Sequence, residues 1–535
     1  MLLFVIRINA QIAPGKYWIQ FTDKNNTPYS VDKPEDFLSE RAIQRRLDYD
    51  IAIDEYDLPI DPSYLEAVEN AGATILNPSK WLNGVSVEIS NPLVLEKINN
   101  FTFVEKTRAL EDEPLKHMIK AKMYDVEMTD MIIDKSPLRN YYGYAYDHIS
   151  QLNGMELHDR GYKGEGMLIG ICDSGYDYAD VHDVFESVRS DGRLIATRDF
   201  VYKDGNVFSI SSHGTSCWSL MAGNIPDVFV GTAPKASYVL CRTEDSAGEN
   251  VIEEYNWVSA AEFLDSLGVD VISTSLGYIS FDNATHNHIY ADLDGKTAVI
   301  TIGSEIAAAK GILCVTSAGN DGDTDFPYIS APADGENVLT VGAVGSDGER
   351  AYFSSVGPTY DGRIKPDLMA HGYNTAVASY NNTYYGGSGT SFACPVMAGM
   401  VSCLWQAYKH LPANKIVEIL KQNANYSSNP NNEYGYGIPD MTQILYYLFV
   451  NEKNINENSI VFIYPNPSNG IVNVRMKENV NVKIYNQTGG LIYDNDVNVR
   501  DSERIEYFLS NLSMGIYIIN INGKSGNQTV KFLKY

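Results

Sequence analysis

Three short motifs place a carboxylate, an imidazole and a hydroxyl in settings suited to catalysis. Asp173 ends the motif G-I-C-D before Ser-Gly, His213 lies in S-S-H-G-T-S, and Ser391 lies in G-G-S-G-T-S-F-A-C-P. A serine hydroxyl is a weak nucleophile at neutral pH, and an imidazole oriented by a carboxylate supplies the base it needs. Taken alone, each motif is more often structural: a turn or cap aspartate, a loop histidine, or a serine at a helix N-cap. Their joint occurrence predicts a nucleophilic site.

The elements around these motifs predict a parallel sheet. Apolar runs of strand length alternate with helical stretches, and such runs are typical of strands buried on both faces by helices. In sheets of this kind the functional groups follow the carboxyl ends of strands. Asp173 and Asn320 both do so. The predicted strands are residues 167–172, 237–241, 269–274 and 312–317, and the predicted helices include residues 253–267 and 302–310.

The region from about Gln151 to Leu445 resembles the subtilisin-like serine proteases (subtilases) in more than these three motifs. The order Asp, His, Ser along the chain is the subtilisin order. Five further segments resemble the family: G-T-A-P-K-A (231–236), S-T-S-L-G (273–277), T-S-A-G-N-D-G (316–322), F-S-S-V-G-P-T (353–359) and K-P-D-L (365–368).

The resemblance assigns a role to each matching residue. It implies that Ser391 is the nucleophile, that His213 is the general base and acid, and that Asp173 orients the imidazole. It also implies that Asn320 donates its amide to the tetrahedral oxyanion beside the backbone N–H of Ser391.

The same resemblance makes residues Ser275, Leu276 and Gly277 the lining of the substrate cleft. The substrate it implies is a polypeptide, and the reaction is peptide-bond hydrolysis through an acyl-enzyme. Two alternatives stay open, namely a catalytically inactive scaffold that binds peptides and another serine hydrolase such as an esterase.

The whole chain divides by texture into five parts. We expect a subtilisin-like three-layer α/β fold with a mainly parallel sheet, preceded by an α+β region and followed by a small β-sandwich. The α+β region resembles a subtilase propeptide, and a permanent accessory domain is the alternative. The predicted parts are residues 1–14 (partial signal peptide), 15–110 (propeptide-like), 111–140 (linker, where we expect cleavage), 141–450 (catalytic) and 460–535 (C-terminal).

The C-terminal part contains Y-P-N-P-S-N-G (464–470), N-L-S-M-G-I-Y (511–517) and a terminal V-K-F-L-K-Y. It resembles a type IX secretion C-terminal sorting domain, although by strand period alone a carbohydrate-binding sandwich would read similarly. The resemblance implies a partner in the type IX machinery. It also implies a protein that is secreted or displayed on the surface of a Gram-negative bacterium.

Composition narrows the remaining partners. The formal net charge of −27, from 68 acidic and 41 basic side chains, argues against nucleic acid, which requires clustered Lys and Arg. No stretch reaches the ~20 apolar residues that span a bilayer, so we predict no transmembrane segment.

Cysteines and metals receive no functional assignment. Cys172, Cys217 and Cys394 lie next to the motifs, and we interpret them as small buried residues. A disulfide among the six cysteines cannot be assigned from the sequence. We expect no required cofactor. The oxygens of Asp321, Asp323 and Asp325 could hold calcium, but alternating Asp around Gly is also ordinary turn composition, so we assign no metal ligand.

Overall fold

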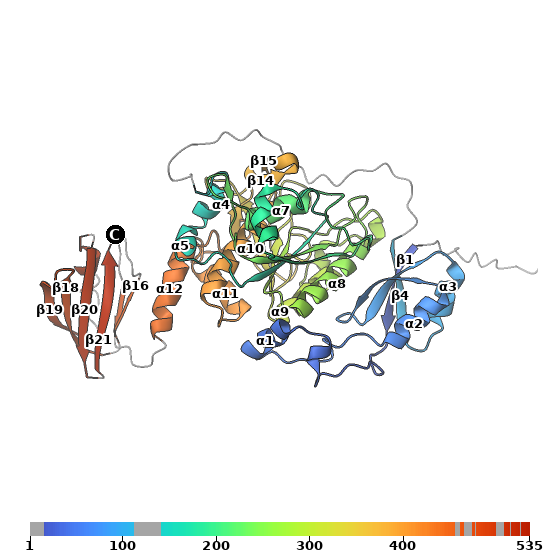
Figure 1. Ribbon diagram of the computed structural model, residues 1–535, viewed down its shortest axis with the longest axis horizontal. Helices are drawn as coiled ribbons and strands as arrows, with labels where there is room; N and C mark the ends of the chain where they lie inside the picture. Colours follow the sequence, from blue (N-terminus) through green and yellow to red (C-terminus); the bar gives the residue numbers. More distant parts are fainter. Residues whose placement is uncertain are drawn as a thin grey trace, which may run out of the picture. The chain divides into compact units, whose positions relative to one another are not determined.

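The computed structural model describes residues 15–111, 141–454, 461–464, 473–476, 478–498, 508–513, 515–524 and 526–534. The predicted signal segment, and the predicted linker beyond Glu111, lie outside these ranges. The chain divides into two compact units, with the boundary between Pro439 and Asp440 (Figure 1).

A seven-stranded parallel sheet forms the centre of the first unit, which confirms the predicted sheet. Its spatial order is β13-β12-β11-β10-β5-β9-β6, and every neighbouring pair is parallel. The strands are β5 (Leu168–Asp173), β6 (Leu194–Asp199), β9 (Ser237–Arg242), β10 (Val271–Thr274), β11 (Leu313–Ser317), β12 (Leu339–Val344) and β13 (Leu368–His371).

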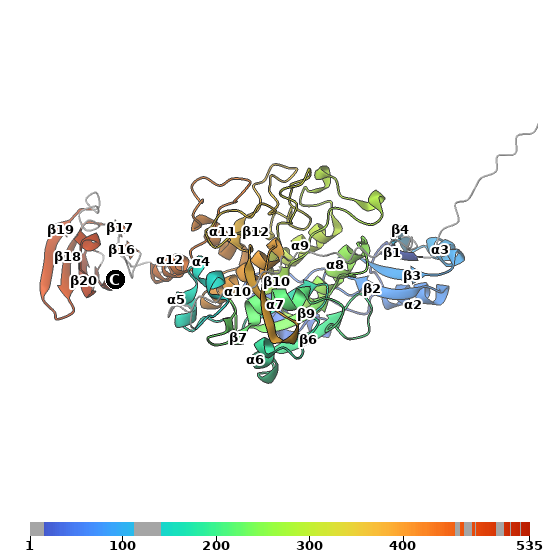
Figure 2. The same cartoon turned by 90° about the horizontal axis from the view of Figure 1, so that it is seen from above.

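Helices cover both faces of this sheet (Figure 2). Helices α7 (His213–Ala222) and α10 (Thr390–Ala407) pack on one another, and so do α8 (Ile252–Leu267) and α9 (Val299–Ala309). Every residue of β5, β10 and β11 is buried, as expected for strands between two helical layers. The smaller elements are α4 (Tyr146–Gln151), α5 (Met155–Asp159), α6 (Glu186–Ser190), α11 (Ala413–Gln422) and the hairpins β7 (Asn224–Ile225) with β8 (Phe229–Val230) and β14 (Thr375–Ser379) with β15 (Thr383–Gly387).

The N-terminal part is an antiparallel sheet with two helices against it. Its spatial order is β2-β3-β1-β4. Because side chains alternate along a strand, Ile19 of β1 belongs to the core shared with α2 and α3, whereas Trp18 faces α8, its ring 4.7 Å from that of Tyr255. The elements are β1 (Gly15–Phe21), α1 (Glu40–Asp48), α2 (Pro62–Ala71), β2 (Thr74–Ser79), β3 (Gly84–Ile89), α3 (Pro92–Asn99) and β4 (Val104–Glu111).

Helix α1 fastens this N-terminal part to α8 through buried ion pairs. Arg45 and Arg46 both pair with Asp265, the second at 2.9 Å. Asp57 extends the network, because it pairs with Arg46 at 2.6 Å and with Lys310 at 2.9 Å. Removing one member of such a network would leave a buried charge without a partner, so the network fixes the register between the two parts.

The second unit consists of a helix and antiparallel strands. A four-stranded sheet, β19-β18-β20-β21, has a core that includes Ile484, Ile519 and Phe532, and β16 pairs with β17. The elements are α12 (Met441–Asn454), β16 (Val461–Tyr464), β17 (Asn473–Met476), β18 (Val480–Asn486), β19 (Leu491–Val497), β20 (Gly515–Gly523) and β21 (Gly526–Lys534). Among the described helices of both units, none has the length and apolarity needed to cross a bilayer.

Candidate active site

The carboxylate and the imidazole meet because two glycine-containing motifs touch. Asp173 is the last residue of β5 and His213 is the first residue of α7. The N–H of Gly214 donates to the carbonyl of Gly175 at 3.0 Å, and a Cβ on Gly214 would lie 2.5 Å from that oxygen. Only glycine permits this approach. It sets His213 Nδ1 2.8 Å from Asp173 Oδ1.

This contact fixes the chemistry of the imidazole. Burial lowers the pKa of His213, but the Asp173 carboxylate and then Cys217 raise it, and the net result is a pKa well above the usual value. The hydrogen bond to Asp173 selects the tautomer with the proton on Nδ1, which leaves Nε2 as the atom that can exchange a proton.

A proline within α10 determines how the serine is held. Ser391 is the second residue of α10, and Pro395, four residues later, has no N–H to donate to the Ser391 carbonyl. That carbonyl instead accepts from Ser275 Oγ at 2.7 Å. In return, Ser391 Oγ donates to the carbonyl of Ser275 at 3.1 Å. The segment after β10 and the start of α10 are therefore bonded together at the serine.

The thiol of Cys217 joins the imidazole to the serine. Its Sγ lies 3.9 Å from both ring nitrogens of His213, and it donates to the carbonyl of Ser391 at 3.4 Å. Burial raises the pKa of Cys217, with His213 acting in the opposite direction. A protonated buried thiol is a poor nucleophile, which agrees with the structural role expected for this residue. All six cysteines are free and buried.

Thr390 orients the amide of Asn320. Both the N–H and the hydroxyl of Thr390 face Asn320 Oδ1, at 2.9 and 3.0 Å. Because a backbone N–H can only donate, the atom opposite it must be the amide oxygen, which leaves Nδ2 as the exposed donor. A Cβ built on Gly389 would lie 3.7 Å from both Asn320 Nδ2 and Ser391 N. Two donors therefore converge on the space beside Gly389.

A cleft of about 960 Å³ opens beside these two donors. The structure brings Ser275, Leu276 and Gly277 to its wall together with Asn320 and Ser391. These five residues were predicted to meet. Asp173 and His213 are not among the residues that line this cleft. Cys217 contacts both the ring of His213 and the backbone carbonyl of Ser391.

The acidic loop that could hold calcium also lines this cleft. Calcium needs several oxygens around one point. Asp321, Asp323 and Asp325 do not gather as a group of three within 4.8 Å, whereas Glu244, Glu249 and Glu253 do, and Glu249 also lines this cleft. We therefore derive no step through a metal.

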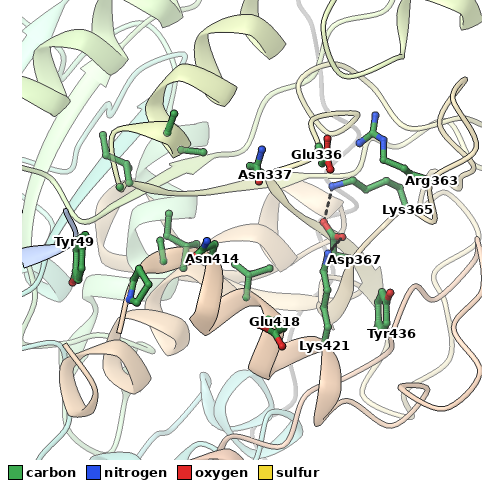
Figure 3. A pocket seen from close by; sticks show the side chains of 18 of the residues that line it. Tyr49, Glu336, Asn337, Arg363, Lys365, Asp367, Asn414, Glu418, Lys421 and Tyr436 are labelled. Atoms are coloured by element: carbon green, nitrogen blue, oxygen red, sulfur yellow. Dashed lines mark hydrogen bonds and ion pairs between the residues drawn. The ribbon is translucent and has the colours of Figure 1, made fainter. Parts of the chain in front are cut away.

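A second cavity, of about 790 Å³, lies at the opposite end of the sheet, where β11 and β13 begin (Figure 3). Both signs of charge line it, and Lys365 and Lys421 pair with Asp367 at 2.7 and 2.6 Å. None of the residues predicted to be catalytic borders this cavity.

Two groups at the site were not predicted. Thr390 was overlooked although it precedes Ser391 directly, and its hydroxyl and N–H are what align Asn320. The aromatic side chains of Phe326 and Tyr352 in the cleft wall come from loops, and no local pattern marks them.

Three known protein families match this chain. The subtilase family model (Peptidase S8) matches residues 164–437, and a Bacteroidota propeptide model of the same peptidase family matches residues 16–124. A secretion system C-terminal sorting domain matches residues 462–535. The chain belongs to the subtilase family of serine proteases. It also carries the propeptide and the sorting domain, as the sequence predicted.

Individual proteins also resemble this chain. Subtilisin NAT from Bacillus subtilis subsp. natto is 30% identical over 295 residues, which cover 54% of this chain and 68% of the relative. Serine protease AprX from Bacillus subtilis (strain 168) is 28% identical over 305 residues, which cover 51% of this chain and 65% of the relative. A crystal structure of MycP1 with its N-terminal propeptide removed aligns at 22% identity and a TM-score of 0.44, covering 56% of this chain and 96% of that one.

Proposed function

We propose that this subtilase is a secreted endopeptidase that cleaves polypeptides through an acyl-enzyme on Ser391. The observation that carries the proposal is the 2.8 Å contact between His213 Nδ1 and Asp173. It reserves Nε2 for the serine proton, and the same packing ties α7 to the start of α10 through Cys217.

In this mechanism Ser391 Oγ attacks the scissile carbonyl while His213 Nε2 takes its proton. Asp173 stabilises the imidazolium that results. His213 then gives the proton to the leaving amine as the peptide C–N bond breaks. Water, deprotonated by His213, attacks the acyl-enzyme carbonyl, and Ser391 Oγ leaves and regains its proton from His213 as the acid is released. The hydroxyl has to turn from the Ser275 carbonyl toward His213, and catalytic hydrogen bonds commonly tighten only when substrate is present.

The oxyanion would form in the space beside Gly389. Asn320 Nδ2 and the N–H of Ser391 both face it, and the latter belongs to the first turn of α10, where the helix dipole favours negative charge. Ser275, Leu276 and Gly277 would support the substrate backbone. This chemistry needs no cofactor, because the imidazole alone activates the hydroxyl.

The flanking parts would control where and when the enzyme acts. We propose that the N-terminal part assists folding and blocks the cleft until the chain is cut between residues 111 and 140. The C-terminal part would be recognised by type IX secretion machinery in a Gram-negative bacterium. Deleting residues 460–535 should leave folded protease behind the outer membrane. Arrival of the truncated protein in the medium would contradict this role.

The test of the catalytic proposal is Ser391→Ala, compared with Ser402→Ala, a buried serine on the same helix. Ser391→Ala should lower casein hydrolysis by about 10⁶-fold, the size known for loss of the serine in a subtilisin. It should also leave the precursor uncut if maturation is autocatalytic. Ser402→Ala should keep activity. A wild-type protein that binds peptides without turnover would instead be the inactive scaffold, and one that cleaves only esters would be an esterase.

A further inference from the structure

The charged residues that line the substrate cleft are all acidic. Four carboxylate residues line it, and among the described lining residues there is no lysine, arginine or histidine. They are Glu249, Asp321, Asp323 and Asp325. Asp321 directly follows the oxyanion residue Asn320 and is half-buried, whereas Asp323 and Asp325 are exposed. A cleft walled by one sign of charge attracts a ligand group of the opposite sign.

A buried hydroxyl in the same wall adds an independent sign of a polar occupant. Ser330 is 3% exposed, and its Oγ has no hydrogen-bond partner among the described residues. It lines the cleft behind Gly277, where a Cβ on that glycine would meet Ser330 Oγ at 2.0 Å. A buried polar group without a partner is costly, so a substrate donor that reached Ser330 would relieve that cost.

The position of the cleft indicates which substrate residue enters it. Ser391 and Asn320 line the cleft, and both act on the carbonyl under attack. His213, which serves the leaving amine, is not among the lining residues. The cleft therefore lies on the acyl side of the scissile bond.

We propose that this cleft selects a lysine or arginine side chain on the substrate residue whose carbonyl Ser391 attacks. The inference rests on the proposed function and adds its substrate class. The ammonium or guanidinium would lie among Asp321, Asp323 and Asp325, and its N–H groups could donate to Ser330.

Two further features agree with a cationic occupant. Burial raises the pKa of Asp321 and the neighbouring Asp323 raises it further, so in the empty cleft the two carboxylates repel one another and a cation would offset that repulsion. Phe326 and Tyr352 also line the cleft, and aromatic rings can pack against a cation and its aliphatic stem.

The experiment measures specificity with quenched peptides that differ only in the residue on the acyl side of the bond, namely Arg, Lys, Leu, Phe or Glu. Purified protein expressed as the full chain should cleave the Arg and Lys peptides with a kcat/KM about 10- to 100-fold above that for Leu, the range expected for a charge-assisted contact. The Glu peptide should be the poorest substrate.

Charge-neutral variants then identify the responsible residues. The triple variant Asp321→Asn, Asp323→Asn, Asp325→Asn should lower the ratio of kcat/KM for Arg over Leu by at least about 10-fold. Asp347→Asn, an exposed aspartate outside the cleft, is the matched control and should leave the ratio unchanged. Each ratio is measured with calcium and with EDTA, and it should not depend on either.

The outcomes separate this inference from the proposed function. Efficient cleavage after Leu or Phe with no preference for Arg or Lys would overturn the inference and leave the peptidase mechanism standing. A preference that disappears in EDTA would overturn it as well, because the acids would then bind a metal. Failure to cleave any peptide, together with no labelling of Ser391 by a serine-directed phosphonate, would overturn both.

Discussion

The two ends of the parallel sheet surround their carboxylates with opposite kinds of neighbours. At the carboxyl ends, every charged residue in the described lining of the substrate cleft is an acid, and the Asp173 carboxylate is hydrogen-bonded to the imidazole of His213 and to the neighbouring Ser174. At the amino ends, the second cavity is lined by charges of both signs, and Asp367 is held by Lys365 and Lys421 (Figure 3).

This difference distinguishes carboxylates that stabilise the fold from carboxylates that are available for binding or catalysis. A carboxylate between two lysines is already neutralised and has nothing left to offer a ligand. A carboxylate that faces an imidazole or an open cleft keeps an interaction available for the reaction. Variants at the two ends should therefore move different measurements, activity at one end and stability at the other.

The largest effect is expected from Asp173→Asn at the carboxyl ends. Asparagine fits the same space but favours the wrong tautomer of His213, so kcat should fall about 10⁴-fold. The urea midpoint should change little. If the variant unfolded readily but kept its kcat per folded molecule, Asp173 would contribute to stability rather than to catalysis.

The second effect is expected from Asp367→Asn at the amino ends. Burial raises the pKa of Asp367, but Lys365 and Lys421 lower it below its usual value, so the carboxylate is charged in the folded protein. Its removal leaves the ammonium of Lys365, which is 2% exposed, without a counter-charge. The free energy of unfolding should fall by about 3–5 kcal/mol.

The control for Asp367→Asn is Glu418→Gln in the same cavity. Glu418 pairs at the surface with Lys415, and exposed pairs contribute little. Its urea midpoint should match that of the wild type, and kcat should be unchanged in both variants. Equal destabilisation by both would show that burial of the pair is not what matters.

The third effect is expected from Asn320→Ala, which removes one of the two oxyanion donors. Turnover should fall about 10²–10³-fold with little change in KM, the magnitude known for the same loss in a subtilisin. Thr390→Val is the companion variant, because it keeps the N–H and removes the hydroxyl that orients Asn320. Thr390→Val should lower turnover less than Asn320→Ala does. An unchanged kcat for Asn320→Ala would show that its amide takes no part in the mechanism.

The smallest effect concerns pH and involves two buried histidines that line neither the substrate cleft nor the second cavity. Burial lowers the pKa of His158 and of His371 to about 4, against about 6.5 in an unfolded chain. Between these values the unfolded state binds protons that the folded state does not, so stability falls as pH drops from about 6.5 toward 4. Each histidine contributes about 1.4 kcal/mol per pH unit.

Urea midpoints measured from pH 7 to pH 4.5 test this expectation. The raised pKa of His213 acts with the opposite sign, because it adds stability as pH falls through the unfolded value of about 6.5, so the slope is read at lower pH, toward 4.5. His371→Asn should therefore flatten the dependence. An unchanged slope would show that His371 is not the titrating group.

The sequence predicted the strands and residues whose local signals are strong. The runs ending at Cys172, Cys241 and Thr274 are strands β5, β9 and β10, with ends within two residues of those predicted. The structure places His213 against Asp173 and brings Ser391 and Asn320 to one cleft with Ser275, Leu276 and Gly277, while the step from His213 to Ser391 stays a prediction. The observed helix α9 begins three residues earlier than predicted.

Long-range features could not be predicted in the same way. Strands β6, β12 and β13 have no distinctive local pattern, and their pairing depends on neighbours far along the chain. The four acids of the cleft lining come from segments around residues 249 and 321–325, which only folding brings together. Once α10 is known, the sequence shows that Pro395 cannot donate a hydrogen bond to the Ser391 carbonyl. The sequence does not show that Ser275 donates to that carbonyl instead.

The most direct test of the account is the mapping of a serine-directed peptidyl phosphonate on intact protein by mass spectrometry. The account predicts one adduct per chain, located on Ser391, with labelling slowed strongly in Asp173→Asn and His213→Ala and unchanged in Ser402→Ala. Casein cleavage without an adduct on Ser391, or an adduct formed equally fast without His213, would contradict it.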